Sequence, residues 1–220
     1  MKKTLRKNSQ LTFLNPKGAG RKAIHDKGIR HIEREAIKKD TVLHLTLKIT
    51  REKAALKNKM ILKCLHHSIK KARGLGLKVI QYTLEYDHIH LLVEASDKVQ
   101  LGIGMQSLGI SLSKGINKIK AQKGKVFKNR YHFRKLSTPK EIKNVLNYIL
   151  GNGIKHKETT SIVNPYNSLC GIKFLKNLYP GFELMIEETI QKSHHLSKLR
   201  EELKSVLTSP RNYHLRQIVG

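Results

Sequence analysis

Acidic residues are scarce in this sequence. Only 16 aspartates and glutamates stand against 44 lysines and arginines, which leaves a formal net charge of +28 over 220 residues. Such a chain repels itself unless it binds a polyanion, so we expect nucleic acid as its partner. Aromatic residues make up only 5%, so charge should contribute more to that binding than base stacking. The length suits one domain with extensions.

Long apolar runs and paired cysteines are missing as well. No run approaches the roughly 20 apolar residues of a membrane-spanning helix, so an anionic membrane is the weaker alternative partner. The basic residues 1–7 lack the apolar segment and cleavage site of a secretory signal. Cys64 and Cys170 are widely separated and form no CxxC motif. We therefore expect a cytoplasmic protein and no membrane partner.

Two histidines lie two residues apart in a β-forming run, residues 86–93. Side chains alternate along a strand, so His88 and His90 share one face while Ile89 and Leu91 point into a core. Two neutral imidazoles on a rigid strand supply half of a divalent metal site. Ordinary core or surface histidines would give the same short motif, so the motif alone is modest evidence.

Hydrophobic periodicity predicts an α+β fold. Alternation or β-rich composition indicates strands at residues 41–49, 77–86, 87–95 and 125–136, and apolar stripes indicate helices at 56–73, 101–119 and from 138 onward. The order βαββαβ followed by a helix is that of a ferredoxin-like antiparallel sheet. We divide the chain into a basic N-terminal arm (1–40), a domain (41–157) and a C-terminal extension (158–220) with an amphipathic helix over 182–207.

Glycines and a capping motif mark two of these helices. Thr138, Pro139 and Glu141 form a well-made helix start, with Thr138 as the N-cap. Gly151 and Gly153 suggest where that helix ends. The preceding helix contains several glycines, each costing about 1 kcal/mol relative to alanine, which close packing on the sheet or on a partner would justify. They are Gly102, Gly104, Gly109 and Gly115.

A tyrosine on the last helix of the domain is the second functional candidate. Tyr148 lies about 100° from the centre of the apolar stripe, where most tyrosines are boundary residues with a solvated hydroxyl. Asn152, four residues later, shares its face if the helix continues through Gly151. An amide oxygen is an acceptable ligand for Mg²⁺ or Mn²⁺.

Together these features resemble the single-tyrosine HUH transposases, and within them the REP-associated tyrosine transposase group. The resemblance spans about residues 41–157. It rests on three segments, which are His88-Ile89-His90 followed by Leu-Leu-Val, the 145–149 helix leading to Asn152, and the basic-aromatic stretch 127–134. Asp87 stands where the family often has asparagine.

The resemblance implies roles for these residues. His88 and His90 would be the metal-binding pair, Asn152 would complete a site for Mg²⁺ or Mn²⁺, and Tyr148 would be the nucleophile. The fold would be that of an HUH endonuclease, acting on nucleoid DNA of a bacterium as a homodimer. The reaction would be metal-dependent cleavage and strand transfer of single-stranded DNA beside a hairpin, through a covalent 5′-phosphotyrosine intermediate.

The 125–136 segment is the predicted DNA contact. Tyr131 and Phe133 would share a face and stack on bases, with core packing an equal alternative for Phe133. His44, on the polar face of the first strand, could contact a phosphate, be solvated, or join the histidine face of the neighbouring third strand. The residues expected to follow the phosphates are Lys125, Lys128, Arg130 and Arg134.

Two other functions remain as alternatives. The first is a non-catalytic, ferredoxin-like binder of RNA or DNA, such as a domesticated transposase relative. An RRM-type binder needs aromatic residues on its central strands, where this chain has His-Ile-His. The second is a metal-dependent hydrolase that uses water, which would need a carboxylate-rich site. The nearby Glu85, Asp87 and Glu94 form no obvious cluster, so we prefer the tyrosine nuclease.

Overall fold

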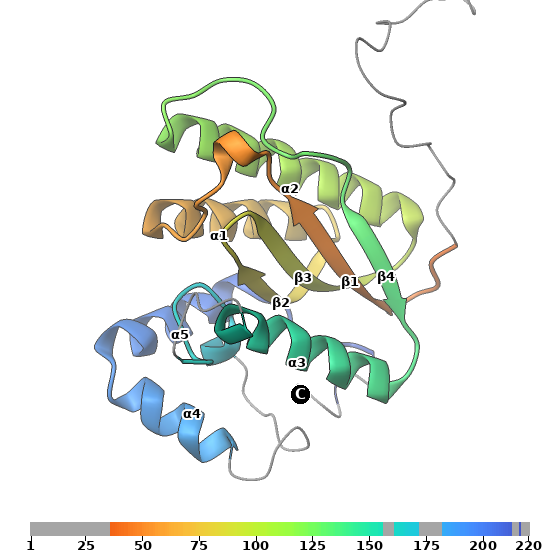
Figure 1. Ribbon diagram of the computed structural model, residues 1–220. Helices are drawn as coiled ribbons and strands as arrows, with labels where there is room; N and C mark the ends of the chain where they lie inside the picture. Colours follow the sequence, from red (N-terminus) through yellow and green to blue (C-terminus); the bar gives the residue numbers. More distant parts are fainter. Residues whose placement is uncertain (1–35, 156–160, 172–181, 213–215, 217–220) are drawn as a thin grey trace, which may run out of the picture. The chain divides into compact units, whose positions relative to one another are not determined.

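The computed structural model describes residues 36–155, 161–171, 182–212 and 216. Residues 1–35 of the predicted N-terminal arm lie outside the described residues. In the described part, four strands form one sheet in the order β2-β3-β1-β4, and each neighbouring pair is antiparallel (Figure 1). The strands are β1 (Thr41–Lys48), β2 (Lys78–Leu84), β3 (His88–Ala95) and β4 (His132–Leu136). This order confirms the predicted ferredoxin-like sheet.

Helices cover both faces of this sheet. α1 (Lys59–Arg73) and α2 (Lys98–Ile119) pack together on one face, and α3 (Pro139–Lys155) lies on the other (Figure 1). Alternation along β1 explains the division. Its odd-numbered leucines are buried towards α1 and α2, whereas His44 and Thr46 face α3. None of the described helices is long and apolar enough to cross a membrane.

Three element boundaries differ from the prediction. The fourth strand begins at His132 rather than near residue 125, and before it only Phe127 forms an isolated bridge with Ile49. α3 runs through both Gly151 and Gly153 to Lys155, so the proposed stop was wrong. The expected single helix over 182–207 is two helices, α4 (Phe182–Gln191) and α5 (His194–Val206), because Ser193 caps a new helix with its hydroxyl.

The start of α3 follows the capping motif of the sequence. The Glu141 amide donates to the Thr138 hydroxyl at 3.2 Å, and the Glu141 carboxylate accepts from the Ser137 and Thr138 amides at 2.8 and 3.2 Å. These contacts satisfy amides that the first helical turn leaves unpaired. They fix the direction in which α3 leaves β4 and crosses the sheet.

Part of the C-terminal extension covers the edge of β2. The Leu84 amide donates to the Tyr166 carbonyl at 2.8 Å, the Ser168 amide to Tyr82 at 3.1 Å, and the Thr208 amide to Val79 at 2.9 Å. These bonds occupy backbone groups that an exposed edge strand would offer to other chains. The described part of the extension is therefore packed into the folded unit that carries the sheet.

Two glycines of α2 predict opposite effects on stability. A Cβ at Gly104 would lie 2.5 Å from the Leu77 Cβ, whereas a Cβ at Gly102 would have no neighbour within 4 Å. Gly102→Ala should therefore raise the free energy of unfolding by about 0.5–1 kcal/mol. Gly104→Ala should lower it by about 1–3 kcal/mol through overpacking. Urea unfolding followed by circular dichroism measures both, and equal effects would contradict the packing argument.

Candidate active site

The candidate residues lie on the sheet face that α3 covers. His90 in β3 is opposite Thr46 of β1 on one side and Thr83 of β2 on the other. The Thr83 hydroxyl donates to the Ile149 carbonyl of α3 at 3.4 Å, which ties this helix to the strand beside the histidines. The alternation of β3 thus places both predicted imidazoles on the side of α3.

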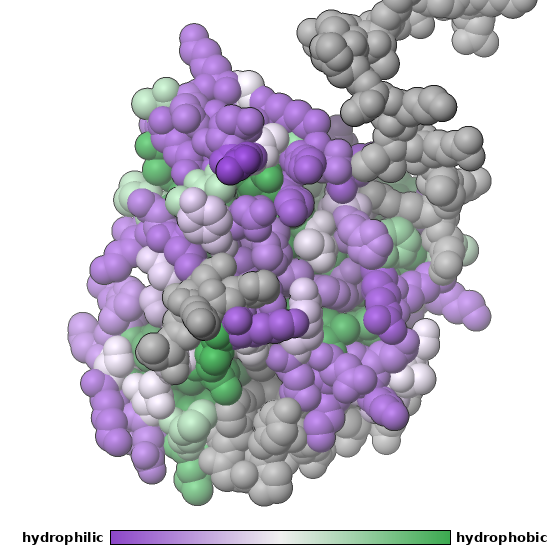
Figure 2. Space-filling view, viewed as in Figure 1, coloured by the Kyte–Doolittle hydropathy of each residue, from purple (hydrophilic) through white to green (hydrophobic). Residues whose placement is uncertain are grey.

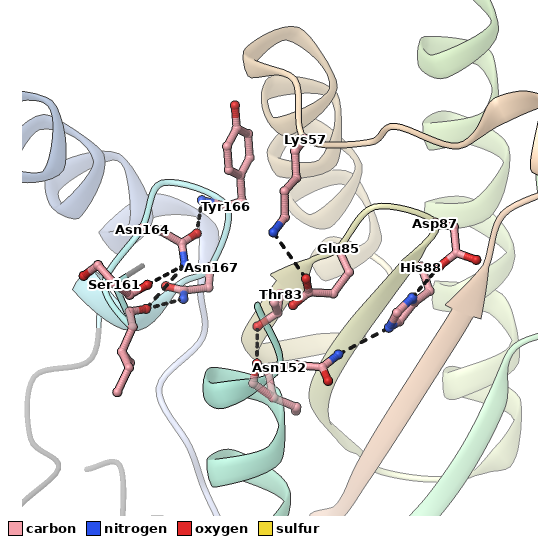
Figure 3. Close-up of polar contacts among 12 residues, drawn as sticks. Lys57, Thr83, Glu85, Asp87, His88, Asn152, Ser161, Asn164, Tyr166 and Asn167 are labelled. Atoms are coloured by element: carbon pink, nitrogen blue, oxygen red, sulfur yellow. Dashed lines mark hydrogen bonds and ion pairs between the residues drawn. The ribbon is translucent and has the colours of Figure 1, made fainter. Parts of the chain in front are cut away.

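His88 lies between a carboxylate and an amide (Figure 3). Its Nδ1–H donates to Asp87 Oδ1 at 2.7 Å, which leaves the lone pair on Nε2. That Nε2 accepts from Asn152 Nδ2 at 3.5 Å. Burial raises the pKa of Asp87, but the hydrogen bond from His88 and the charges of His88 and Lys48 together bring it below its ordinary value. Asp87 therefore stays an acceptor, as in the carboxylate–histidine pairs that orient metal ligands.

His90 is more deeply placed, with 3% of its surface exposed. Its Nδ1 is 3.0 Å from His44 Nε2 and 3.2 Å from Thr46 Oγ1. Burial, followed by the charges of His44 and His88, lowers the pKa of His90 to about 3. Burial, followed by two basic residues of β4, lowers the pKa of His44 to about 4. Both rings are thus neutral at pH 7, and each has one lone pair to offer.

Tyr148 projects from α3 over the histidines. Its ring centroid is 5.5 Å from that of His90 and 6.3 Å from that of His44. The residue is 47% exposed, so a substrate can reach it. Because α3 continues through Gly151, Asn152 follows one turn later on the same side of the helix. One chain therefore brings together Tyr148, both predicted histidines and Asn152.

Two buried polar atoms indicate that this site fits a divalent cation. His90 Nε2 and Asn152 Oδ1 are among the buried side-chain atoms of the described residues that have no hydrogen-bond partner. Such atoms are rare in native proteins, and an ion is one common explanation. Two imidazoles and an amide oxygen are a suitable partial set for Mg²⁺ or Mn²⁺. Within the described ranges no three His, Cys, Asp or Glu side chains form a metal-binding group.

Comparison with known proteins identifies the family of this chain. The sequence profile described as "Transposase IS200 like" matches residues 38–152, more than half of the chain. The chain belongs to the IS200-like transposase family. This confirms the resemblance to single-tyrosine transposases. No curated protein matches this transposase.

Solved structures show the shared fold. A REP-associated tyrosine transposase bound to a REP hairpin matches with a TM-score of 0.55 and 17% sequence identity, over 69% of this transposase and 89% of that chain. At this low sequence identity the match shows a shared fold and nothing about function. A bacterial tRNA(His) guanylyltransferase-like protein in complex with GTP matches with a TM-score of 0.42 and 8% identity, over 58% of this chain and 70% of that one. A TM-score that low supports no argument.

The candidate site includes residues to which the sequence assigned no role. Asp87 binds His88, and Thr46 lies beside His90. A carboxylate directly before a metal-type histidine is a recognisable pattern, but the place of Thr46 depends on strand register. Glu85 is fully buried near Thr83, and its carboxylate lies 3.3 Å from Lys57 Nζ (Figure 3). This ion pair packs beside the histidines rather than adding a carboxylate cluster to them.

The predicted DNA contacts of this transposase are more dispersed. Lys125, Lys128 and Arg130 are exposed in the segment before β4. Arg134 is exposed but forms a 3.1 Å ion pair with Glu141. Hydrophilic side chains cover much of the described surface in view in Figure 2. Three of the four predicted contacts are thus exposed basic side chains, and the fourth is exposed but paired with a carboxylate.

The aromatic residues of that segment lie against the core. Phe133 is opposite Leu45 in the β1–β4 register, so it faces α1 and α2 and is half-buried. Core packing is thus the correct reading of Phe133. Tyr131 precedes the strand and is half-buried in the same way. Two other tyrosines are more exposed. They are Tyr148 and Tyr86, and Tyr86, directly before Asp87, is 56% exposed.

Proposed function

We propose that this transposase is a metal-dependent single-stranded DNA endonuclease and strand transferase that uses Tyr148 as a covalent nucleophile. The observation that carries the proposal is the convergence of an exposed phenol with two imidazoles held in place by hydrogen bonds and the Asn152 amide on one sheet face. The phenol ring is 5.5 Å from the ring of His90. A nucleic-acid binder without catalysis has no need of this arrangement.

The chain's own residues would perform the transfer as follows. The Tyr148 oxygen attacks the phosphorus of a phosphodiester, the phenol loses its proton, and a new oxygen–phosphorus bond forms. The bond to the 3′ oxygen breaks, and that oxygen takes up a proton as a free 3′-hydroxyl. The 5′ phosphate remains on tyrosine, which keeps the phosphodiester energy for resealing without ATP.

His88, His90 and Asn152 would hold the divalent ion, Mg²⁺ or Mn²⁺. When bound, the ion supplies positive charge to a non-bridging phosphate oxygen and helps to orient the phosphate for attack. Asp87 keeps His88 in the tautomer that has its lone pair on Nε2, and burial keeps His90 neutral. Tyr148 lies on a helix that is hydrogen-bonded to β2, so the phenol and the ligands are held at a fixed separation.

The substrate we propose is single-stranded DNA next to a hairpin. The similar structure contains a REP hairpin, and this chain has a net charge of +28. Lys125, Lys128 and Arg130 would follow the phosphates, so affinity should fall steeply with salt. We also propose that Tyr131 contacts the DNA. The basic N-terminal arm would be a second contact with the phosphates.

The size of the acting unit and its place in the cell are also proposals. We propose that the protein acts as a homodimer on nucleoid DNA in the cytoplasm. Light scattering of the purified protein measures its mass and so tests the dimer. The described chain carries Tyr148 beside its own histidines, so cleavage would not require a partner's helix. We also propose that residues 41–157 carry the catalytic residues, with the arm (1–40) and the extension (158–220) outside this catalytic segment.

A doubly labelled oligonucleotide tests the proposed reaction. A pool of hairpins with randomised single-stranded flanks carries one dye at the 5′ end and another at the 3′ end. With Mg²⁺ or Mn²⁺, an SDS-resistant adduct should carry the 3′ dye only, and the 5′-labelled product should be extendable by a polymerase. With EDTA neither should form. If the pool binds tightly but gives no adduct, the protein is a binding protein instead.

A further inference from the structure

The sequence left three places open for His44, which were a phosphate contact, solvent, and the histidine face of the third strand. In the structure its Nε2 lies 3.0 Å from His90 Nδ1, on the histidine face. The two rings are stacked, with centroids 5.1 Å apart and planes inclined by 30°. Tyr148 closes another side at a centroid distance of 6.3 Å. The nitrogen that could have met a phosphate is thus directed at a predicted metal ligand.

A single proton between these two nitrogens determines what His90 can bind. If His90 Nδ1 carries it, this group donates to His44 Nε2, and His90 Nε2 keeps its lone pair. If His44 Nε2 carries it, a neutral His90 must hold its own proton on Nε2. That atom is buried and has no hydrogen-bond partner in the described part of the chain. The second arrangement buries an unpaired N–H group, which is unfavourable.

We propose that His44 is a positioning residue that holds His90 in its Nδ1–H tautomer and so directs the Nε2 lone pair to the metal site. The proposal rests on the proposed function for the role of His90. His44 would thus accept a hydrogen bond from His90 Nδ1–H, as Asp87 accepts one from His88 Nδ1–H at 2.7 Å. One ligand is thus oriented by a carboxylate and the other by a neutral imidazole.

Thr46 limits the size of the expected effect. Its hydroxyl is 3.2 Å from the same His90 nitrogen and can also accept a hydrogen bond from Nδ1–H. Loss of His44 should therefore weaken metal binding rather than abolish it. In other metalloproteins, removal of a residue that hydrogen-bonds to a metal ligand reduces metal affinity by about 10–100-fold.

Three variants distinguish a His44 that orients His90 from a His44 that contacts a DNA phosphate. His44→Leu keeps the bulk but removes the acceptor. His44→Gln can place its amide oxygen where Nε2 now lies. His132→Leu removes another imidazole from the same sheet face, since His132 is exposed and opposite Thr46 on β4. A phosphate-contacting role would make His44→Leu and His132→Leu similar in DNA binding, whereas positioning would separate them in metal binding.

Two measurements decide the proposal. Long-range proton–nitrogen NMR of the metal-free wild-type protein should show His90 as the Nδ1–H tautomer, and the Nε2–H tautomer would overturn the proposal. Calorimetric titration with Mn²⁺ should show affinity about 10–100-fold weaker for His44→Leu, with His44→Gln and His132→Leu close to wild type. DNA binding in EDTA should not change.

Other outcomes are equally informative. Wild-type Mn²⁺ affinity in His44→Leu would reject the positioning role, as would a selective loss of DNA affinity in EDTA. If wild-type protein binds no Mn²⁺, the metal site of the proposed function fails, and the tautomer measured without metal still judges the His44 contact on its own.

Discussion

The Tyr148→Phe variant should lose the covalent DNA adduct while it keeps DNA binding. Phenylalanine retains the ring beside His90 and removes only the oxygen that can bond to phosphorus. Loss of a covalent nucleophile commonly costs a thousand-fold or more, so about that loss or greater is expected in adduct formation. The ring is 47% exposed, so folding should be unaffected. The 3′-labelled hairpin pool on an SDS gel measures the adduct, and fluorescence anisotropy in EDTA measures binding.

Tyr86→Phe is the matched control for this variant. Tyr86 is also exposed, at 56%, and lies two residues before His88, but α3 does not carry it. Its hydroxyl should be dispensable for the adduct. An adduct that persists in Tyr148→Phe and disappears in Tyr86→Phe would move the nucleophile to the turn between β2 and β3.

Much of the fold could be predicted because its local patterns agree with its tertiary packing. Leu43, Leu45 and Leu47 alternate with polar residues, and the structure buries them against α1 and α2. Thr138 and Glu141 predicted the start of α3 through a capping motif whose hydrogen bonds are formed. In both cases the residues that determine the element are neighbours in sequence.

Boundaries failed where tertiary contacts outweigh local preference. Gly151 suggests a helix end because glycine costs about 1 kcal/mol in a helix. Ile149 and Asn152 on either side of it are buried, and their packing continues α3 to Lys155. The segment before β4 has the composition of a strand but pairs with β1 only from His132 onward.

The site was predictable in its members and not in its contacts. His88 and His90 share a face because of alternation alone, and Tyr148 and Asn152 share one because of helical spacing. The contact of His44 with His90 depends on the register that places Thr46 opposite His90. A slip by one residue would turn His44 to the other face. That register is set by the whole sheet, so no short motif contains it.

Replacement of both His88 and His90 by alanine should remove metal binding and, with it, the adduct. The two imidazoles supply both nitrogen ligands of the proposed site, and Asn152 alone offers a single neutral oxygen. His67→Ala is the matched control, because His67 is exposed on α1, away from the α3 face. Circular dichroism of all three proteins checks that the fold survives the loss of the buried His90 ring.

Thermal unfolding measures the loss of metal binding without any DNA. A ligand that binds only the folded protein stabilises it by about 2.7 kcal/mol at a concentration 100 times its dissociation constant. Mn²⁺ should therefore raise the melting temperature of the wild-type and His67→Ala proteins and leave that of the double variant unchanged. The adduct should disappear in parallel, because the phosphate would lose the positive charge that the site supplies. If Mn²⁺ still stabilises the double variant to the wild-type extent, the ion binds elsewhere, and His88 and His90 are structural residues of a DNA-binding sheet.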